Sequence, residues 1–171
     1  NLGMHGAYAC NMAVNECDLL FSIGTRFNDR ITGKLHSFAP RAQIVHIDID
    51  TAAISKNVQV DVPIVADAKE AITKMLEYVT ECNTKKWLDE VGEWKIEHPL
   101  TMKKKPIMTP QDVIETINRV FDEAIIVTDV GQHQMFTAQF IEITEKKKLL
   151  MSGGLGTMGY GFPAAIGAQV A

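Results

Sequence analysis

Short, almost wholly apolar runs alternate with amphipathic segments along the chain. Both faces of a strand are covered in a parallel sheet, so such strands lose the polar alternation of half-exposed ones. The apolar runs therefore predict buried strands at residues 18–23, 43–49, 62–65, 124–130 and 148–151. Helical spacing predicts helices at residues 7–17, 51–57, 68–82, 84–98, 109–121 and 132–141, with loops at 1–6 and 25–34. This alternation favours an α/β fold with parallel sheets.

A change in composition at residues 99–106 divides the chain. This segment, PLTMKKKP, holds two prolines and three lysines and interrupts the pattern, so we expect a linker. After it, Thr109 can cap a helix whose first position is Pro110, and Asp112 suits the positive end of the helix dipole. We therefore expect two α/β pieces, residues 1–98 and 107–171.

Composition narrows the classes of function. A net charge of −4 over 171 residues, without a basic stripe, argues against a nucleic-acid partner. No apolar run reaches the roughly 20 residues of a membrane-spanning helix, so we expect no membrane partner. Cys10, Cys17 and Cys82 lack metal-ligand spacing and suit a reducing, cytoplasmic compartment. Because the sequence starts without methionine and stops within a predicted helix, we interpret it as an internal piece of a longer protein.

The most distinctive stretch is residues 148–171, KLLMSGGLGTMGYGFPAAIGAQVA. A strand, a glycine-rich turn and a helix start in this order can present bare backbone N–H groups to a phosphate. The frame Gly154-x-Gly156-x-x-Gly159 fits the dinucleotide fingerprint, which also needs an acidic residue about 20 positions later, beyond the end of this sequence. A tight packing turn and a nicotinamide-binding turn both remain open.

Four predicted strand ends are polar or rich in glycine. They are residues 24–30, 48–50, 130–134 and 152–159. Ligands of open α/β sheets bind beyond the carboxyl ends of the strands, so these segments are candidate sites.

Each of these candidate sites also has a structural alternative. The guanidinium groups of Arg26 and Arg30 suit a phosphate or carboxylate, or pairing with a carboxylate of their own loop. Asp48 could accept from a ribose hydroxyl or cap a helix together with Asp50 and Thr51, and residues 130–134 could bind a pyrophosphate or cap a helix. His5 could be an ordinary loop histidine.

Serine-protease, HExxH, P-loop and paired CxxC motifs do not occur in the sequence. Nucleophilic and zinc chemistry therefore lack support.

Together these stretches resemble the catalytic subunit of the acetolactate synthase (acetohydroxyacid synthase) family of thiamine diphosphate enzymes. The matching segments are LGMHGAYACNMAVNECDLLFSIGTRFNDR, IVHIDID, DVGQHQMFTAQF and SGGLGTMGYGFPAAIGAQVA. HIDID is widespread among thiamine diphosphate enzymes, whereas LGMHG, RF-x-DR and GQHQM in combination are more specific. The sequence departs from the family pattern at Asn28, Ala66 and Phe136, where aspartate, glycine and tryptophan are more usual.

The resemblance implies a specific domain organisation. Residues 1–98 would be the C-terminal half of a Rossmann-like (FAD-binding, DHS-like) middle domain with a parallel sheet. Residues 99–106 would be a linker, and residues 107–171 would begin the thiamine diphosphate-binding α/β domain.

The resemblance also implies three groups of binding residues. Those expected at the substrate are Met4, Asp29 and Arg30. Those expected at FAD are Leu2, Gly3, Met4, His5, Gly24, Thr25, Arg26, Asn28, Arg30, Ile31, Asp48, Ile49, Asp67 and Ala68. Those expected at thiamine diphosphate are Val130, Gly131, Gln132, His133, Gln134, Gly156 and Met158.

The implied reaction is decarboxylation of pyruvate and carboligation to a second 2-ketoacid. The product would be 2-acetolactate or 2-aceto-2-hydroxybutyrate, in the first common step of branched-chain amino-acid biosynthesis. Thiamine diphosphate, magnesium and FAD would be the cofactors. The resemblance implies a homodimer or homotetramer and leaves open a small regulatory subunit.

The family's activating glutamate is expected in an N-terminal domain and its magnesium motif after Ala171. We therefore expect no catalytic residue and no metal ligand in this chain, and the chain alone should be inactive. Three alternatives stay open. One is another thiamine diphosphate enzyme, such as glyoxylate carboligase or pyruvate oxidase. Another is the dinucleotide-binding module of an oxidoreductase, and the third is a non-catalytic binding or regulatory piece.

Overall fold

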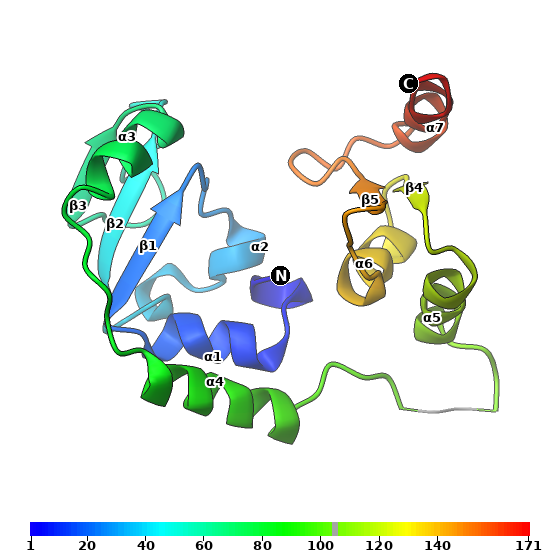
Figure 1. The fold of residues 1–171 in the computed structure, drawn as a ribbon, viewed down its shortest axis with the longest axis horizontal. Coiled ribbons are helices and arrows are strands. Elements are labelled where there is room, and N and C mark those ends of the chain that lie inside the picture. The colour runs from blue at the N-terminus through cyan, green and yellow to red at the C-terminus, as the bar shows by residue number, and fades with distance from the viewer. Residues whose placement is uncertain (104–105) are drawn as a thin grey trace. The chain divides into compact units, whose positions relative to one another are not determined.

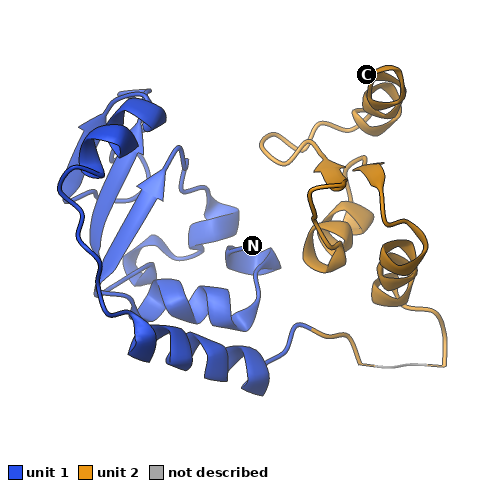
Figure 2. Ribbon diagram, in the orientation of Figure 1, with its two compact units in different colours: residues 1–100 blue, residues 101–171 orange. Residues whose placement is uncertain are grey.

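A computed structural model describes residues 1–103 and 106–171. The chain forms two compact units, Asn1–Leu100 and Thr101–Ala171 (Figure 2). The division falls inside the segment that the composition predicts as a linker, of which residues 104–105 lie outside the described part. None of the helices among the described residues is long and apolar enough to cross a membrane.

Unit 1 is built on a three-stranded parallel sheet in the order β1-β2-β3 (Figure 1). The strands are β1 (Leu19–Ile23), β2 (Gln43–Asp48) and β3 (Val62–Val65). The helices are α1 (Tyr8–Glu16), α2 (Asp29–Thr32), α3 (Ala68–Met75) and α4 (Lys85–Glu97), with 3-10 turns η1 (Gly3–His5) and η2 (Leu35–Ser37). Helix α3 contacts β2, and α1 packs along α4.

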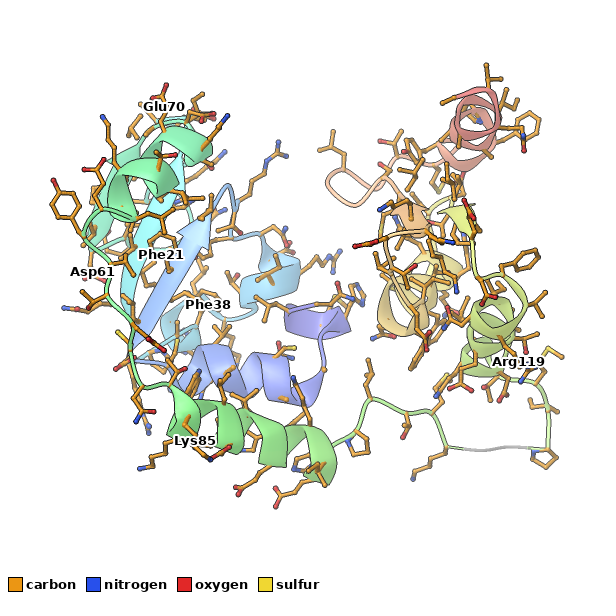
Figure 3. All side chains as sticks on the ribbon, in the orientation of Figure 1. Phe21, Phe38, Asp61, Glu70, Lys85 and Arg119 are labelled. Atoms are coloured by element: carbon orange, nitrogen blue, oxygen red, sulfur yellow. The ribbon has the colours of Figure 1, made fainter. Side chains whose placement is uncertain are left out.

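The core of unit 1 gathers side chains from the sheet and the loops around it. Its buried members are Phe27, Ala39, Ile44, Val58 and Val60. Val14 of α1, Leu20 of β1 and Phe38 pack against this cluster. Side chains alternate along a strand, so Phe21 lies on the other face of β1 and remains 40% exposed (Figure 3).

One carboxylate fixes the backbone at the edge of this core. The Oδ2 atom of Asp61 accepts the N–H of Ile44 at 2.7 Å (Figure 3 labels Asp61). This bond joins the loop before β3 to the start of β2.

Unit 2 pairs two parallel strands, β4 (Ala124–Val127) and β5 (Lys147–Leu150). Its helices are α5 (Pro110–Val120), α6 (Gln132–Phe140) and α7 (Gly161–Val170). Helix α5 begins where the sequence predicts, with Thr109 as its cap, and Asp112 completes a capping box. Thr109 Oγ1 accepts the N–H of Asp112 at 3.3 Å, and the Asp112 carboxylate accepts the N–H of Thr109 at 2.7 Å.

The α/β class with parallel sheets is confirmed. Several local predictions are wrong. The strands are not all buried on both faces, since Leu19, Phe21 and Ile23 of β1 are 40% to 53% exposed, and β4 ends at Val127 instead of residue 130. Residues 51–57 form turns instead of a helix, because Ser55 adopts a φ of 54° and the Asp50 carboxylate accepts the N–H of Ala52. Helix α3 stops at Met75 instead of residue 82. The apolar side chains that follow Met75 are not covered by other elements, and Leu76 is 68% exposed. The loop predicted at residues 25–34 contains α2.

Candidate functional site

Unit 1 places η1 directly against α2. A Cβ on Gly3 would lie 1.9 Å from the carbonyl oxygen of Arg30, so only glycine fits there. Asn11 of α1 holds the same glycine from the other side. Its Oδ1 accepts the N–H of Gly3 at 2.8 Å and its Nδ2 donates to the Gly3 carbonyl at 3.0 Å. Two predicted site segments, separated by more than 20 residues in sequence, are therefore neighbours.

A cavity of about 280 Å³ opens between these elements. All three residues predicted at the substrate, Met4, Asp29 and Arg30, line it. Leu2, Gly3 and Ile31, predicted at FAD, line it as well. Arg30 Nη1 lies 3.7 Å from Met4 Sδ and points the guanidinium toward this side chain.

The two arginines of this region keep their charge available. Within the described residues, neither Arg26 nor Arg30 forms an ion pair with a carboxylate, so pairing within their own loop is not observed. An exposed guanidinium beside a cavity can bind a carboxylate or phosphate through two parallel hydrogen bonds.

A second set of predicted residues lies at the carboxyl ends of the strands. Gly24 follows β1 and donates its N–H to Ile47 O of β2 at 2.8 Å. Asp48 ends β2, and Asp67 follows β3. Parallel strands bring these ends to one edge, which is where ligands of open sheets bind. The other predicted members there are Thr25, Arg26, Ile49 and Ala68. None of this set lines the 280 Å³ cavity.

Three polar side chains predicted at FAD also serve the local structure. Asn28 caps α2 by accepting the N–H groups of Arg30 and Ile31. Asp67 caps α3. Asp48 Oδ1 accepts the N–H of Asp50 at 2.9 Å. These bonds do not use the second carboxylate oxygens of Asp48 and Asp67 or the NH2 group of Asn28, so capping and ligand binding are compatible.

A buried histidine behind Asp48 was not singled out by the sequence. His46 is fully buried, and neither ring nitrogen has a hydrogen-bond partner among the described residues. Its Nε2 lies 3.7 Å from Asp48 Oδ2, and its ring meets the edge of Phe27 at 5.1 Å between centroids. A histidine inside an otherwise apolar strand was the available signal.

In unit 2, the predicted diphosphate segment forms the start of α6. Gly131, with a φ of 146°, precedes the helix, and no side chain caps it. The first N–H groups of a helix have no partner within it, and the helix dipole makes this end positive. Residues 132–134 therefore present donors suited to an anion.

The glycine-rich loop after β5 comes next to this helix start. A Cβ built on Gly156 would lie 3.8 Å from Val130 Cγ1, so two predicted cofactor residues are in contact distance. Gln134 Nε2 donates to Ser152 O at 3.2 Å, and Ser152 Oγ accepts the N–H of Thr157 at 3.0 Å. Met158 is 78% exposed and offers an apolar surface beside these polar groups.

Asp129 joins the two segments, and the sequence interpretation missed it. Its carboxylate accepts the N–H of Val130 at 2.7 Å, of Gly159 at 3.1 Å and of Gly161 at 2.8 Å. The N–H groups of Val130, Gly161 and Gly159, in this order, hold the pKa of Asp129 below its usual range, and nearby His133 adds to the effect. An acidic residue at a strand end was the signal that could have found it.

This carboxylate also bears on the dinucleotide alternative. In a dinucleotide-binding turn, the pyrophosphate occupies the N-terminus of the helix after the glycines. Here that helix is α7, and the Asp129 carboxylate already accepts the N–H of its first residue, Gly161. The anion position of this turn is filled by the protein's own side chain, which leaves the start of α6 for a ligand.

The donor set of unit 2 fits a diphosphate, since it combines a free helix start with a close glycine backbone. Magnesium is different. The described residues contain no group of three or more histidine, cysteine, aspartate or glutamate side chains that could hold a metal ion.

Two family models match the chain. "Thiamine pyrophosphate enzyme, central domain" matches residues 1–75, and "Thiamine pyrophosphate enzyme, C-terminal TPP binding domain" matches residues 129–171. The first therefore covers the cavity and sheet edge of unit 1, and the second covers Asp129, α6 and the glycine loop.

Curated relatives agree over almost the whole chain. The acetolactate synthase large subunit of Cyanidium caldarium is 47% identical over 99% of this chain. That of Parasynechococcus marenigrum is 46% identical over 99%, and the probable acetolactate synthase large subunit of Methanocaldococcus jannaschii is 47% identical over 99%. The chain spans 28% to 31% of the length of these three relatives. It belongs to the thiamine pyrophosphate enzymes and is similar to the large subunits of acetolactate synthase.

Proposed function

We propose that the protein containing this chain is an acetolactate synthase. It would decarboxylate pyruvate and join the remaining two-carbon unit to a second 2-ketoacid, giving 2-acetolactate or 2-aceto-2-hydroxybutyrate. The observation that supports this most is the 47% identity over 99% of the chain, which includes every predicted site segment. The reaction would be the first common step of branched-chain amino-acid biosynthesis in the cytoplasm.

Unit 2 would bind the diphosphate of thiamine diphosphate. When bound, this cofactor supplies the electron sink that decarboxylation needs. The N–H groups at the start of α6, from Gln132 to Gln134, would donate to the diphosphate oxygens. Gly131 and Gly156 would let the backbone come close, Val130 would shield one side, and exposed Met158 would provide the apolar support for the cofactor's rings.

Unit 1 would bind the 2-ketoacid and FAD. Arg30, unpaired with any described carboxylate, would hold the substrate carboxylate inside the cavity that Met4 and Asp29 also line. FAD would use the strand-end residues together with η1 and α2. Because the net reaction is not a redox one, FAD would be structural.

The assembly and the remaining cofactor belong to the same proposal. Magnesium would be bound by residues outside this chain, as the family resemblance implies. A homodimer or homotetramer would be the functional form. The 171-residue chain alone, about 30% of the length of its relatives, would have no synthase activity.

The test uses the purified whole protein with thiamine diphosphate, magnesium and FAD. Pyruvate should be converted to 2-acetolactate with release of carbon dioxide and without net formation of peroxide. Peroxide formed in step with pyruvate consumption would support a pyruvate oxidase instead. Carboligation with glyoxylate but not pyruvate would support a glyoxylate carboligase.

A further inference from the structure

The glycine loop of unit 2 needs an external constraint to keep one conformation. Residues 153–159 are all exposed, and four of these seven are glycines, which have the largest conformational freedom. Gly156 and Gly159 both have positive φ angles, of 62° and 86°. Inside the loop, Ser152 supplies two hydrogen bonds, to the N–H groups of Gly156 and Thr157. These bonds fix the first half of the loop only.

Asp129 supplies the constraint for the second half. Its carboxylate accepts the N–H of Gly159 and of Gly161, residues 30 and 32 positions later in the sequence. The backbones approach closely enough that a Cβ on Gly161 would lie 2.8 Å from Asp129 N. The end of β4 and the start of α7 are therefore joined by one side chain.

The Asp129 carboxylate also determines which backbone N–H groups remain free to bind an anion. The starts of α6 and α7 are both positive helix ends. Asp129 occupies the N–H of Gly161, the first residue of α7, and its negative charge repels a second anion from that position. Its bond to the N–H of Val130 leaves the N–H groups of residues 132–134 at the start of α6.

From this geometry we propose that Asp129 is a positioning residue for the cofactor's diphosphate. It does not touch the diphosphate. It clamps the second half of the glycine loop, which includes Met158, to the end of β4, and it directs the anion to the start of α6 instead of α7. The proposal rests on the proposed function, because it requires that unit 2 binds thiamine diphosphate.

The test compares Asp129→Asn with the unaltered whole protein. The amide keeps the shape but places an NH2 group where two backbone N–H groups converge. In the apo protein, hydrogen–deuterium exchange of a peptide covering residues 152–161 should become faster. Calorimetric titration with thiamine diphosphate and magnesium should show binding weakened by about tenfold or more, as expected for loss of charge-assisted hydrogen bonds. At saturating cofactor, the KM for pyruvate should stay within twofold, because the substrate cavity lies in unit 1.

Asp112→Asn is the matched control, since it removes another carboxylate of unit 2 that accepts a backbone N–H, that of Thr109. It should lower thermal stability without weakening cofactor binding. Should Asp129→Asn fail to fold, Asp129→Glu keeps the charge on a longer arm and should give a smaller loss of affinity of the same kind. Cofactor binding by Asp129→Asn within twofold of the unaltered protein would overturn the proposal.

A different result would overturn the proposed function. If the unaltered protein bound no thiamine diphosphate, that function would be overturned together with the role of Asp129 toward the diphosphate. The exchange experiment would then still report whether Asp129 clamps the loop.

Discussion

The backbone of Gly3 lies against the carbonyl oxygen of Arg30 so closely that a Cβ on the glycine would come within 1.9 Å of it. The glycine also has a φ of 74°, which side chains rarely tolerate. This contact sets the spacing between η1 and α2. It therefore determines the width of the cavity in which Met4 and Arg30 meet.

Gly3→Ala should disrupt this cavity and destabilise unit 1. Both the left-handed φ and the backbone clash act against the new methyl group, so we expect a loss of about 2 kcal/mol or more in the free energy of unfolding. The KM for pyruvate should rise in the whole protein, because Arg30 moves with α2. Urea unfolding and steady-state kinetics measure the two effects.

Gly24→Ala is the matched folding control in the apo protein. Gly24 also has a positive φ, of 60°, but a Cβ there would meet no atom within 4 Å. Its substitution should cost only the conformational strain, about 1 kcal/mol. Equal losses for both variants would show that the contact with Arg30 does not matter.

Arg30→Ala should weaken binding of the 2-ketoacid specifically. The guanidinium is exposed at the cavity and pairs with no described carboxylate, so its removal leaves the fold intact and the substrate carboxylate without its partner. We expect the KM for pyruvate to rise by about tenfold or more, as for loss of a charge-assisted bidentate pair. Arg30→Lys should recover part of the loss, because an ammonium keeps the charge without the fork.

Arg41→Ala serves as the control for removing a surface arginine. Arg41 pairs with Glu16 outside the cavity, and its side chain is 69% exposed. Such pairs contribute little, so neither stability nor KM should change measurably. A similar rise in KM for both variants would point to a general charge effect instead of a specific role for Arg30.

Local features of this chain were predictable from the sequence, and distant contacts were not. The start of α5 at Thr109, Pro110 and Asp112 is encoded within four residues and was predicted, although the reciprocal bond from the Thr109 N–H to Asp112 was not. The clamp formed by Asp129 joins residues 30 and 32 positions apart, which no periodicity reveals. The helix predicted at residues 51–57 is wrong for a related reason. The segment has helical composition but is too short to form a helix without tertiary packing.

The candidate site, too, was predictable in its local features and not in its distant contacts. The rule that ligands bind at the carboxyl ends of parallel strands placed Asp48 and Gly131 at the ends of their strands, and the family resemblance added Asp67. It could not show that Gly3 and Arg30 share a cavity while Asp48 lies outside it. That distinction depends on how η1 folds back on α2. Occupation of all these residues by FAD, substrate or thiamine diphosphate stays a prediction.

His46→Phe should leave the free energy of unfolding unchanged or raise it by up to about 1 kcal/mol. His46 is fully buried with both ring nitrogens unpaired, and an aromatic ring of similar size removes these unsatisfied groups while keeping the contact with Phe27. Ile47→Ala, at the neighbouring fully buried position, should instead cost about 3 kcal/mol through loss of packing. Urea unfolding compares the two. A loss above about 2 kcal/mol for His46→Phe would show that the 3.7 Å approach to Asp48 is a stabilising ion pair.

Acid should release the glycine loop from Asp129. The pKa of Asp129 in the folded protein is lowered by the N–H groups of Val130, Gly161 and Gly159, so the folded state favours the ionised carboxylate more than the unfolded state does. The resulting stabilisation is fully present above the ordinary aspartate pKa of about 3.9 and is lost as the pH falls through the lowered pKa. Hydrogen–deuterium exchange of residues 152–161, corrected for the intrinsic pH dependence of exchange, should therefore stay slow from pH 7 to about pH 4 and accelerate only below that. Asp129→Asn should exchange fast throughout, without this step. Loss of protection between pH 5 and 7 would contradict the assignment to Asp129.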